Sequence, residues 1–180
     1  MLLLLGSDPK LQDKLFESIK DLSPREVLRD SLIKGIIKEA LRLYPIAPFI
    51  TRYLPEDNVI GGYFVPKGEL LLLSVHSSSR DPRNFLRPEE FYPERWIRTE
   101  NGNYRDVIHP HASIPFALGV RSCVGRKLAE TQIALALAKL VRTFKIKCTN
   151  KDEVKLILHL ISVPSKPIKL ELIQRNFKGR

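Results

Sequence analysis

The stretch IPFALGVRSCVGRKLAE, residues 114–130, contains Cys123, one of the two cysteines of the chain. Gly119 and Gly125 flank this cysteine, and a helix-like run follows directly. Because glycine has no Cβ, these positions permit a tight turn and let a bulky group approach the backbone. The start of a helix favours an anion, since its free N–H groups and its dipole are partly positive. The stretch therefore places a thiol where a thiolate is favoured as a ligand or nucleophile.

Arg121 lies two residues before the cysteine and adds a fixed positive charge that can bind a carboxylate. A thiolate facing a flat ligand that carries carboxylates describes haem, with the iron bound to sulfur and a propionate bound to the arginine. A buried free cysteine beside a loop is the alternative that a single cysteine leaves open. With only Cys123 and Cys148, the chain has no disulfide framework.

The same residues resemble the cytochrome P450 family of haem-thiolate monooxygenases, whose signature is F-x-x-G-x-R-x-C-x-G. The fixed positions are all filled here, by Phe116, Gly119, Arg121, Cys123 and Gly125. Ala117 stands where the family commonly has glycine. The resemblance implies that haem is the cofactor, that Cys123 is the axial ligand of its iron and that Phe116 packs on the thiolate side.

A second resemblance is the E-x-x-R pair in KEALRLYP, residues 38–45, which supplies Glu39 and Arg42. Three positions on a helix put both side chains on one face, but such pairs are common and usually exposed. In the family the pair is buried and completed by an arginine that precedes the cysteine loop. Arg95 in YPERW, residues 92–96, matches that arginine. The resemblance implies a structural role for all three residues.

Two further segments also resemble the family, so that the likeness extends over almost the whole chain. The segment ITRYLPEDNVIGGYFVPKG, residues 50–68, is similar to a sheet segment whose arginine reaches a haem propionate. This implies that Arg52 is a second propionate partner; a surface arginine on a strand is the alternative. The segment HSSSRDPRNFLRPEEFYPERW, residues 76–96, leads toward the cysteine loop in the family's order.

The net charge of +10 favours an acidic partner, an anionic membrane or a nucleic acid. We expect no nucleic-acid partner, because the sequence shows neither a known reading motif nor aromatic residues interleaved with the basic ones. Lys34 and Lys38 share one helix face, and Arg126 and Lys127 follow the cysteine loop. In the mitochondrial branch of the family, basic residues at these places bind a ferredoxin of the adrenodoxin type. Ordinary solvated cations are the alternative.

The resemblance therefore implies a mitochondrial enzyme on the matrix side of the inner membrane that hydroxylates a sterol or steroid with O2. Insect ecdysteroid-synthesising hydroxylases are similar in particular, and mitochondrial enzymes that act on xenobiotics are an alternative. The opening MLLLLG is too short for a targeting or membrane segment. Membrane association would require a part of the protein outside this chain.

The predicted fold is α+β and mainly helical, the C-terminal portion of the cytochrome P450 fold with small sheets and the cysteine loop. We expect residues 1–180 to be an incomplete domain, because the family's oxygen-activating helix, with its A-G-x-x-T pattern, should precede the first helix. The chain then holds no oxygen-activating threonine and is expected to be inactive alone. A non-catalytic remnant that binds haem weakly or not at all is the alternative reading.

Local patterns predict the elements that surround these motifs. Asp8 and Pro9 cap one helix, and a capping box from Ser23 to Glu26 begins a second, which we expect to end at Pro45. Residues 49–75 predict a small sheet, and residues 76–115 an irregular segment with a helical turn at 88–91. A helix over 126–142 and a terminal hairpin between 155–160 and 168–172 complete the expectation.

Overall fold

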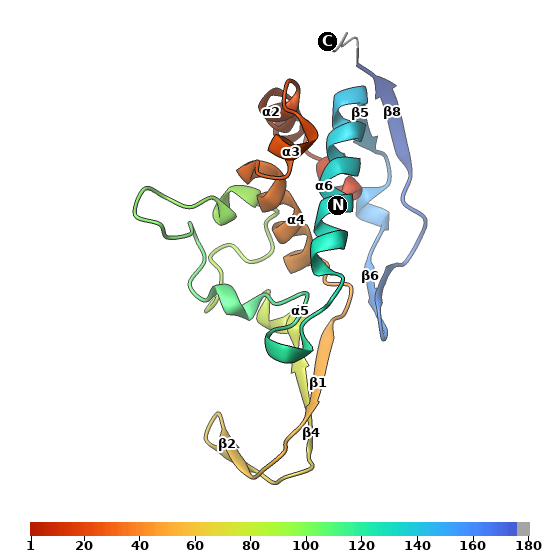
Figure 1. The fold of residues 1–180 in the computed structure, drawn as a ribbon. Coiled ribbons are helices and arrows are strands. Elements are labelled where there is room, and N and C mark those ends of the chain that lie inside the picture. Colours follow the sequence, from red (N-terminus) through yellow and green to blue (C-terminus); the bar gives the residue numbers. More distant parts are fainter. Residues whose placement is uncertain (176–180) are drawn as a thin grey trace.

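The computed structural model describes residues 1–175 and has the predicted α+β composition (Figure 1). Its helices are α1 (Leu2–Leu5), α2 (Pro9–Ile19), α3 (Pro24–Val27), α4 (Ser31–Leu43), α5 (Val75–Ser78) and α6 (Arg126–Thr143). Helices α2, α4 and α6 pack together, and a narrow ribbon of strands extends away from them (Figure 1).

The main core lies where α2, α4 and α6 meet. Helix α4 carries apolar residues at helical spacing, and Ile33 and Ile36 are fully buried on this face. Leu15 and Ile19 from α2 and Val141 from α6 belong to the same cluster. Asp8 begins α2 as predicted, because its carboxylate accepts a hydrogen bond from the Leu11 N–H at 3.0 Å.

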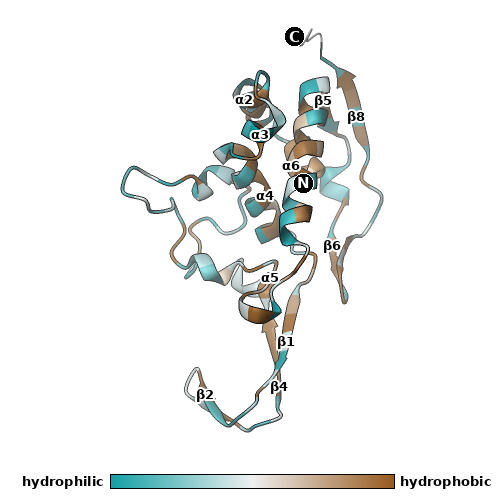
Figure 2. Cartoon of the chain, viewed as in Figure 1, coloured by the Kyte–Doolittle hydropathy of each residue, from teal (hydrophilic) through white to brown (hydrophobic). Residues whose placement is uncertain are grey.

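Within the described residues, the strands form two-stranded antiparallel sheets. The pairs are β1 (Phe49–Tyr53) with β4 (Leu70–Ser74), β2 (Asn58–Ile60) with β3 (Tyr63–Val65), β5 (Phe144–Cys148) with β8 (Leu170–Gln174), and β6 (Leu156–Leu158) with β7 (Ser162–Pro164). The sheet predicted over residues 49–75 is therefore present. Strand β4 is hydrophobic along most of its length, whereas β1 is hydrophobic at its start and hydrophilic toward its end (Figure 2). Several of the hydrophobic residues in this pair, among them Phe49, Leu70 and Leu72, are exposed.

The prediction of a single helix from Ser23 to Pro45 was wrong. The capping box is present, but α3 ends after Val27 and α4 begins at Ser31. Asp30 separates the two helices, because its carboxylate accepts a hydrogen bond from the Ile33 N–H at 2.8 Å and caps α4. A local cap therefore divided an apolar pattern that looked continuous.

The predicted terminal hairpin was also wrong in its pairing. Strand β6 pairs with β7 across a short turn, whereas β8 pairs with β5, the strand that follows α6. Likewise the predicted helical turn at 88–91 is an ordinary turn, and 3-10 turns lie instead at η1 (Pro93–Trp96), η2 (Pro110–Ala112) and η3 (Gly119–Arg121). The rest of residues 76–115 is largely irregular, as predicted. None of the helices within residues 1–175 is long and apolar enough to cross a lipid bilayer.

Candidate haem-thiolate site

The carboxylate of Glu39 is the centre of a buried polar network. Arg42, one helical turn later, donates to it from Nε and Nη2, each at 2.9 Å. Arg95 donates from Nε at 2.9 Å, and the Trp96 indole N–H donates at 2.8 Å. The backbone N–H of Tyr92 adds a fifth contact at 3.1 Å. The side chains of Glu39, Arg42 and Arg95 have no exposed surface, so their charges are compensated inside the protein.

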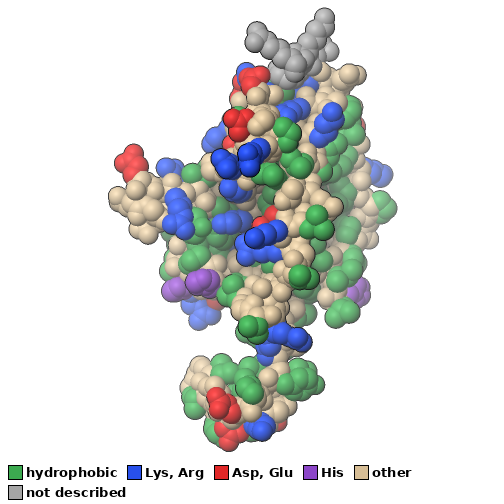
Figure 3. Space-filling model, viewed as in Figure 1, with side chains coloured by type: hydrophobic (Ala, Val, Ile, Leu, Met, Phe, Trp, Pro, Cys, Tyr) green, Lys and Arg blue, Asp and Glu red, His purple; other side chains and the backbone are tan. Residues whose placement is uncertain are grey.

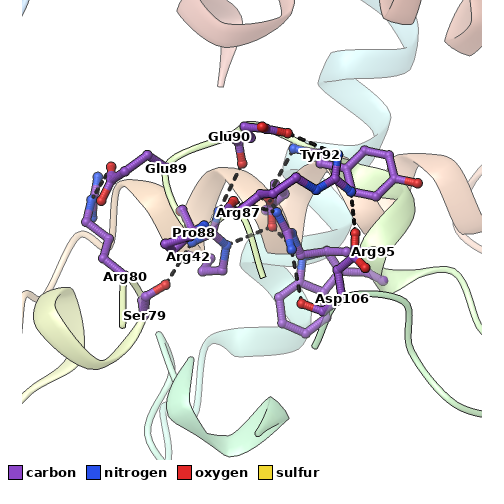
Figure 4. A network of polar contacts seen from close by, with 12 residues as sticks. Arg42, Ser79, Arg80, Arg87, Pro88, Glu89, Glu90, Tyr92, Arg95 and Asp106 are labelled. Carbon is purple, nitrogen blue, oxygen red and sulfur yellow. Dashed lines mark hydrogen bonds and ion pairs between the residues drawn. The ribbon is translucent and has the colours of Figure 1, made fainter. Parts of the chain in front are cut away.

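The two guanidinium groups also hold the irregular segment in place (Figure 4). Arg42 donates to the carbonyl oxygens of Ser79, Pro88 and Glu90 at 2.7, 2.6 and 3.1 Å. Arg95 donates to the carbonyl oxygens of Leu86, Arg87 and Asp106 at 2.8, 3.1 and 3.2 Å. Buried arginine donors rarely remain unpaired, and backbone carbonyls satisfy them here. The network therefore fixes residues 79–106 against helix α4.

Sequence reasoning missed Trp96 as a member of this network. The only feature of the sequence that could have indicated its role is its position, since this single tryptophan of the chain directly follows Arg95. Within η1, consecutive residues Arg95 and Trp96 both reach the same carboxylate, which a helix-periodic argument does not anticipate. The ring centroids of Trp96 and Tyr104 lie 5.6 Å apart with an interplanar angle of 73°, so Trp96 links the polar network to an edge-to-face aromatic contact.

Cys123 lies on the loop between η3 and α6, with an exposed thiol. Its backbone N–H donates to the Phe116 carbonyl at 2.8 Å, and its own carbonyl accepts from the Arg126 N–H at 3.3 Å. Gly119 has a φ of 72°, in the left-handed region that favours glycine, and nothing lies within 4 Å of the position that a Cβ would occupy. Ala117 also has a positive φ, 58°, where the family's usual glycine would be unstrained.

The surroundings of the thiol fit a large flat apolar group with a single thiolate ligand. The side chains of Val120 and Val124 are fully exposed on either side of the cysteine, and Leu118 and Leu128 are more than half exposed. Such a concentration of exposed apolar side chains indicates a surface that binds a ligand or another part of a protein. In the described part of the chain no three His, Cys, Asp or Glu residues cluster as metal ligands. A single thiolate such as that of Cys123 can serve as the protein ligand of an iron held in a porphyrin.

The two arginines predicted to bind the haem propionates, Arg121 and Arg52, lie in different parts of the structure. Arg121 lies in the cysteine loop and is exposed, and its side chain forms no hydrogen bond or ion pair with any residue in 1–175, so its charge is available to an anion. Arg52 lies on β1 opposite Leu71, and its Nη1 donates to the neighbouring Thr51 carbonyl at 2.7 Å. No hydrogen bond joins Arg52 to the cysteine loop. Gly125 is the N-cap of α6, and a Cβ there would lie 3.9 Å from the Cys123 sulfur.

The predicted docking cations line one groove between α4 and α6, of about 390 Å³. Lys34 and Lys38 come from α4, and Arg126 and Lys127 from the first turn of α6. Apolar residues line the groove between them, namely Leu28, Ile33, Ile37 and Ala134. Lys and Arg side chains gather over these helices on the face shown in Figure 3. Residues about ninety positions apart thus form one basic surface, which we call the docking groove.

Lys38 differs from Lys34 in its contacts. Its ammonium nitrogen lies 5.4 Å from the ring centroid of Trp96 and 5.2 Å from that of Tyr104, and 3.3 Å from the Tyr104 hydroxyl. These are cation–π distances. The ammonium nitrogen of Lys34 instead donates to the Arg29 carbonyl at 3.3 Å and is exposed. One docking cation is therefore half-buried against aromatic rings, and the other is exposed and bonded to a backbone carbonyl.

Comparison with known proteins identifies the family. The family model Cytochrome P450 matches residues 1–172. The chain is 40% identical to "Cytochrome P450 315a1, mitochondrial" of Drosophila melanogaster, covering 97% of this chain and 32% of that protein. It is 33% identical to "Sterol 26-hydroxylase, mitochondrial" of Homo sapiens, covering 95% and 34%. It is 36% identical to "Cholesterol side-chain cleavage enzyme, mitochondrial" of Hypanus americanus, covering 95% and 33%.

A solved structure agrees with the sequence comparison. The crystal structure of a cytochrome P450, CYP102L1, superposes with a TM-score of 0.83 at 27% identity, covering 97% of this chain and 40% of that one. The chain spans about a third of the length of the curated relatives that it matches. The expected likeness to mitochondrial members is confirmed by the names of these relatives, and haem, the expected cofactor, is the cofactor of the family. The chain belongs to the cytochrome P450 family.

Proposed function

We propose that this chain is the haem-ligating part of a mitochondrial monooxygenase that hydroxylates an apolar substrate of the sterol or steroid class. The observation that carries this proposal is the cysteine loop, which presents one exposed thiol between uncovered apolar side chains. The family of the chain and the sterol-related names of its relatives support the same conclusion. When bound, haem supplies the activation of O2 that inserts one oxygen atom into a C–H bond and releases the other as water.

In this proposal the residues of the loop divide the binding of haem among them. Cys123 holds the iron through its sulfur, and Arg121 and Arg52 bind the propionates through their guanidinium groups. Phe116 excludes water from the thiolate side, and Gly119 and Gly125 leave room for the ring. The buried Glu39 network has a structural role, because it holds the chain that leads to this loop in register.

Electrons in this proposal come from an acidic ferredoxin of the adrenodoxin type that binds the docking groove. The groove offers the positive charge that an acidic protein surface needs, and Leu28 at its edge is partly exposed. A mitochondrial location accords with the names of the relatives. We place the enzyme on the matrix side of the inner membrane because the proposed partner is a ferredoxin of the adrenodoxin type.

Two apolar segments are the candidates for substrate contact, residues 45–49 and residues 161–164. They are joined by a hydrogen bond of 2.7 Å from the Ser162 N–H to the Ile46 carbonyl, and the side chains of Ile46 and Ile161 are exposed. An apolar surface of this kind suits a steroid. The likeness to a Drosophila relative favours an insect steroid, and a xenobiotic is the alternative substrate class.

We infer further that residues 1–180 correspond to the C-terminal part of a single, longer domain, which accords with the share of the relatives that the chain covers. The oxygen-activating threonine would then lie outside this chain. The opposing reading, a truncated remnant that does not hold haem, predicts the same sequence motifs and differs in a measurable property, the binding of haem.

The test is the carbon monoxide difference spectrum of the reduced, haem-loaded protein. We expect the red-shifted Soret band that a thiolate ligand produces, lost in Cys123→Ser and kept in Cys148→Ser, the matched change at the other cysteine. A thiolate band that survives Cys123→Ser would contradict the assignment of the ligand. Absence of haem binding by the unaltered chain, with binding by a longer form that includes the upstream segment of the relatives, would support the remnant reading.

A further inference from the structure

The two ends of the cysteine loop are held together by backbone and side chains. Cys123 accepts a hydrogen bond from the Arg126 N–H and donates one to the Phe116 carbonyl, at 3.3 and 2.8 Å. The guanidinium carbon of Arg126 also lies 5.7 Å from the centroid of the Phe116 ring. This is within the range of a cation–π contact. The cysteine therefore lies inside a loop whose first and last residues, Phe116 and Arg126, touch each other.

Arg126 is also part of the docking groove, where its charge is only loosely held. Its Nε lies 3.0 Å from Oε1 of Glu130, one turn further along α6, and the two side chains are 49% and 36% exposed. Exposed ion pairs of this spacing are weak, so another carboxylate can replace Glu130 at little cost. A second hollow of about 270 Å³ is lined by Phe116 and shares Lys38, Arg126 and Glu130 with the docking groove.

We propose that Arg126 couples the docking of the electron donor to the cysteine loop. A carboxylate of the ferredoxin takes the place of Glu130 on the Arg126 guanidinium and draws it from the Phe116 ring. Phe116 then relaxes, and the hydrogen bond between its carbonyl and the Cys123 N–H changes. Arg126 is in this sense a positioning residue, which acts on the thiol through Phe116. The inference rests on the proposed ferredoxin docking and adds a consequence of docking to it.

Lys127 provides a matched comparison. It follows Arg126 directly, lines the same docking groove and carries the same charge. Its side chain forms no hydrogen bond, ion pair or ring contact with any residue in the described part of the chain. Electrostatic attraction to the partner therefore depends on both residues, whereas coupling to the cysteine loop depends on Arg126 alone.

The experiment titrates the haem-loaded protein with an adrenodoxin-type ferredoxin and records the dissociation constant and the haem difference spectrum at saturation. The variants are Arg126→Gln and Lys127→Gln. We expect both to weaken binding by a similar factor, about two- to five-fold, since each removes one exposed charge. Only Arg126→Gln should lose the partner-induced haem difference spectrum at saturating ferredoxin. A response that both variants retain, or that both lose, overturns the coupling.

Glu130→Gln tests the same inference without altering the arginine. Because it releases Arg126, the spectrum of the partner-free variant should move toward that of the docked wild type, and docking should add less change. If the partner-free spectrum of Glu130→Gln is unaltered and its docking response is full, the inference is overturned. This outcome is decisive even where Arg126→Gln cannot be loaded with haem. If the wild-type protein does not bind the ferredoxin, the proposed docking fails and the coupling fails with it. If it binds with no change at the haem, the coupling alone is wrong.

Discussion

Arg95 donates a hydrogen bond from Nε to Oε1 of Glu39 across 2.9 Å, although 56 positions separate the two residues in the chain. Neither side chain has exposed surface. The bond joins helix α4 to the irregular segment that leads to the cysteine loop. Because Arg42 binds the same carboxylate, the position of this segment depends on one buried ionic group.

Arg95→Ala should lower the free energy of unfolding by about 3–5 kcal/mol, because it removes one of the two guanidinium groups that compensate the buried Glu39 carboxylate and leaves the Leu86 carbonyl without a partner. Urea unfolding followed by circular dichroism measures the change. Arg105→Ala is the matched control, since Arg105 is exposed and its side chain forms no hydrogen bond, ion pair or ring contact with any residue in 1–175, and its loss should cost under about 0.5 kcal/mol. Equal effects of the two changes would show that the network does not stabilise the segment.

Gly119→Ala should destabilise the cysteine loop by about 1–2 kcal/mol, because its φ of 72° is unfavourable for residues with a Cβ. We also expect weaker haem binding, measured by titration of the haem-free protein with hemin. Gly61→Ala places the same strain, at a φ of 59°, in the distant β2–β3 turn. That variant should lose a similar amount of stability and keep its haem affinity. Unchanged affinity in Gly119→Ala would argue against contact between haem and this part of the loop.

Lys34→Gln and Lys38→Gln should differ although both remove one charge from the docking groove. Both should weaken ferredoxin binding and make it less dependent on salt. Lys38→Gln alone should also lower the free energy of unfolding, by about 0.5–1 kcal/mol, because its ammonium group contacts Trp96 and Tyr104. Isothermal titration across a salt series and thermal unfolding separate the two effects. A loss of stability in Lys34→Gln of the same size would contradict this distinction.

The pKa of His76 is lowered from 6.5, first because burial disfavours the charged imidazolium and next because Arg80 repels it, while Glu89 acts weakly in the opposite sense. The unfolded chain therefore binds the proton more readily than the folded one. The free energy of unfolding is therefore unaffected by His76 above pH 6.5. It falls as the pH drops from 6.5 through the lowered pKa of the folded state. Urea unfolding between neutral and mildly acid pH should show this decline, and His76→Gln should reduce its slope. An identical slope in the variant would assign the decline to other groups.

Much of the local structure could be predicted from contiguous residues. The capping box of Ser23 and Glu26 and the cap at Asp8 depend on side chains within three positions of the backbone groups that they bind. Strand β1 and helix α6 follow equally local patterns. Where two local signals competed, prediction was wrong: the cap at Asp30 divided the helix expected from Ser23 to Pro45.

The sequence by itself determined the family, the candidate thiolate ligand and the pairing of Glu39 with Arg42, because each depends on residue types at short fixed spacing. Only the tertiary structure decided the pairing of β5 with β8, the contact of Trp96 with Glu39 and the groove that joins Lys34 to Arg126. These contacts join residues far apart in the chain, and their geometry depends on how the helices pack against each other. These contacts depend on which side chains become buried when the helices pack, and the spacing of residues within one segment does not show this.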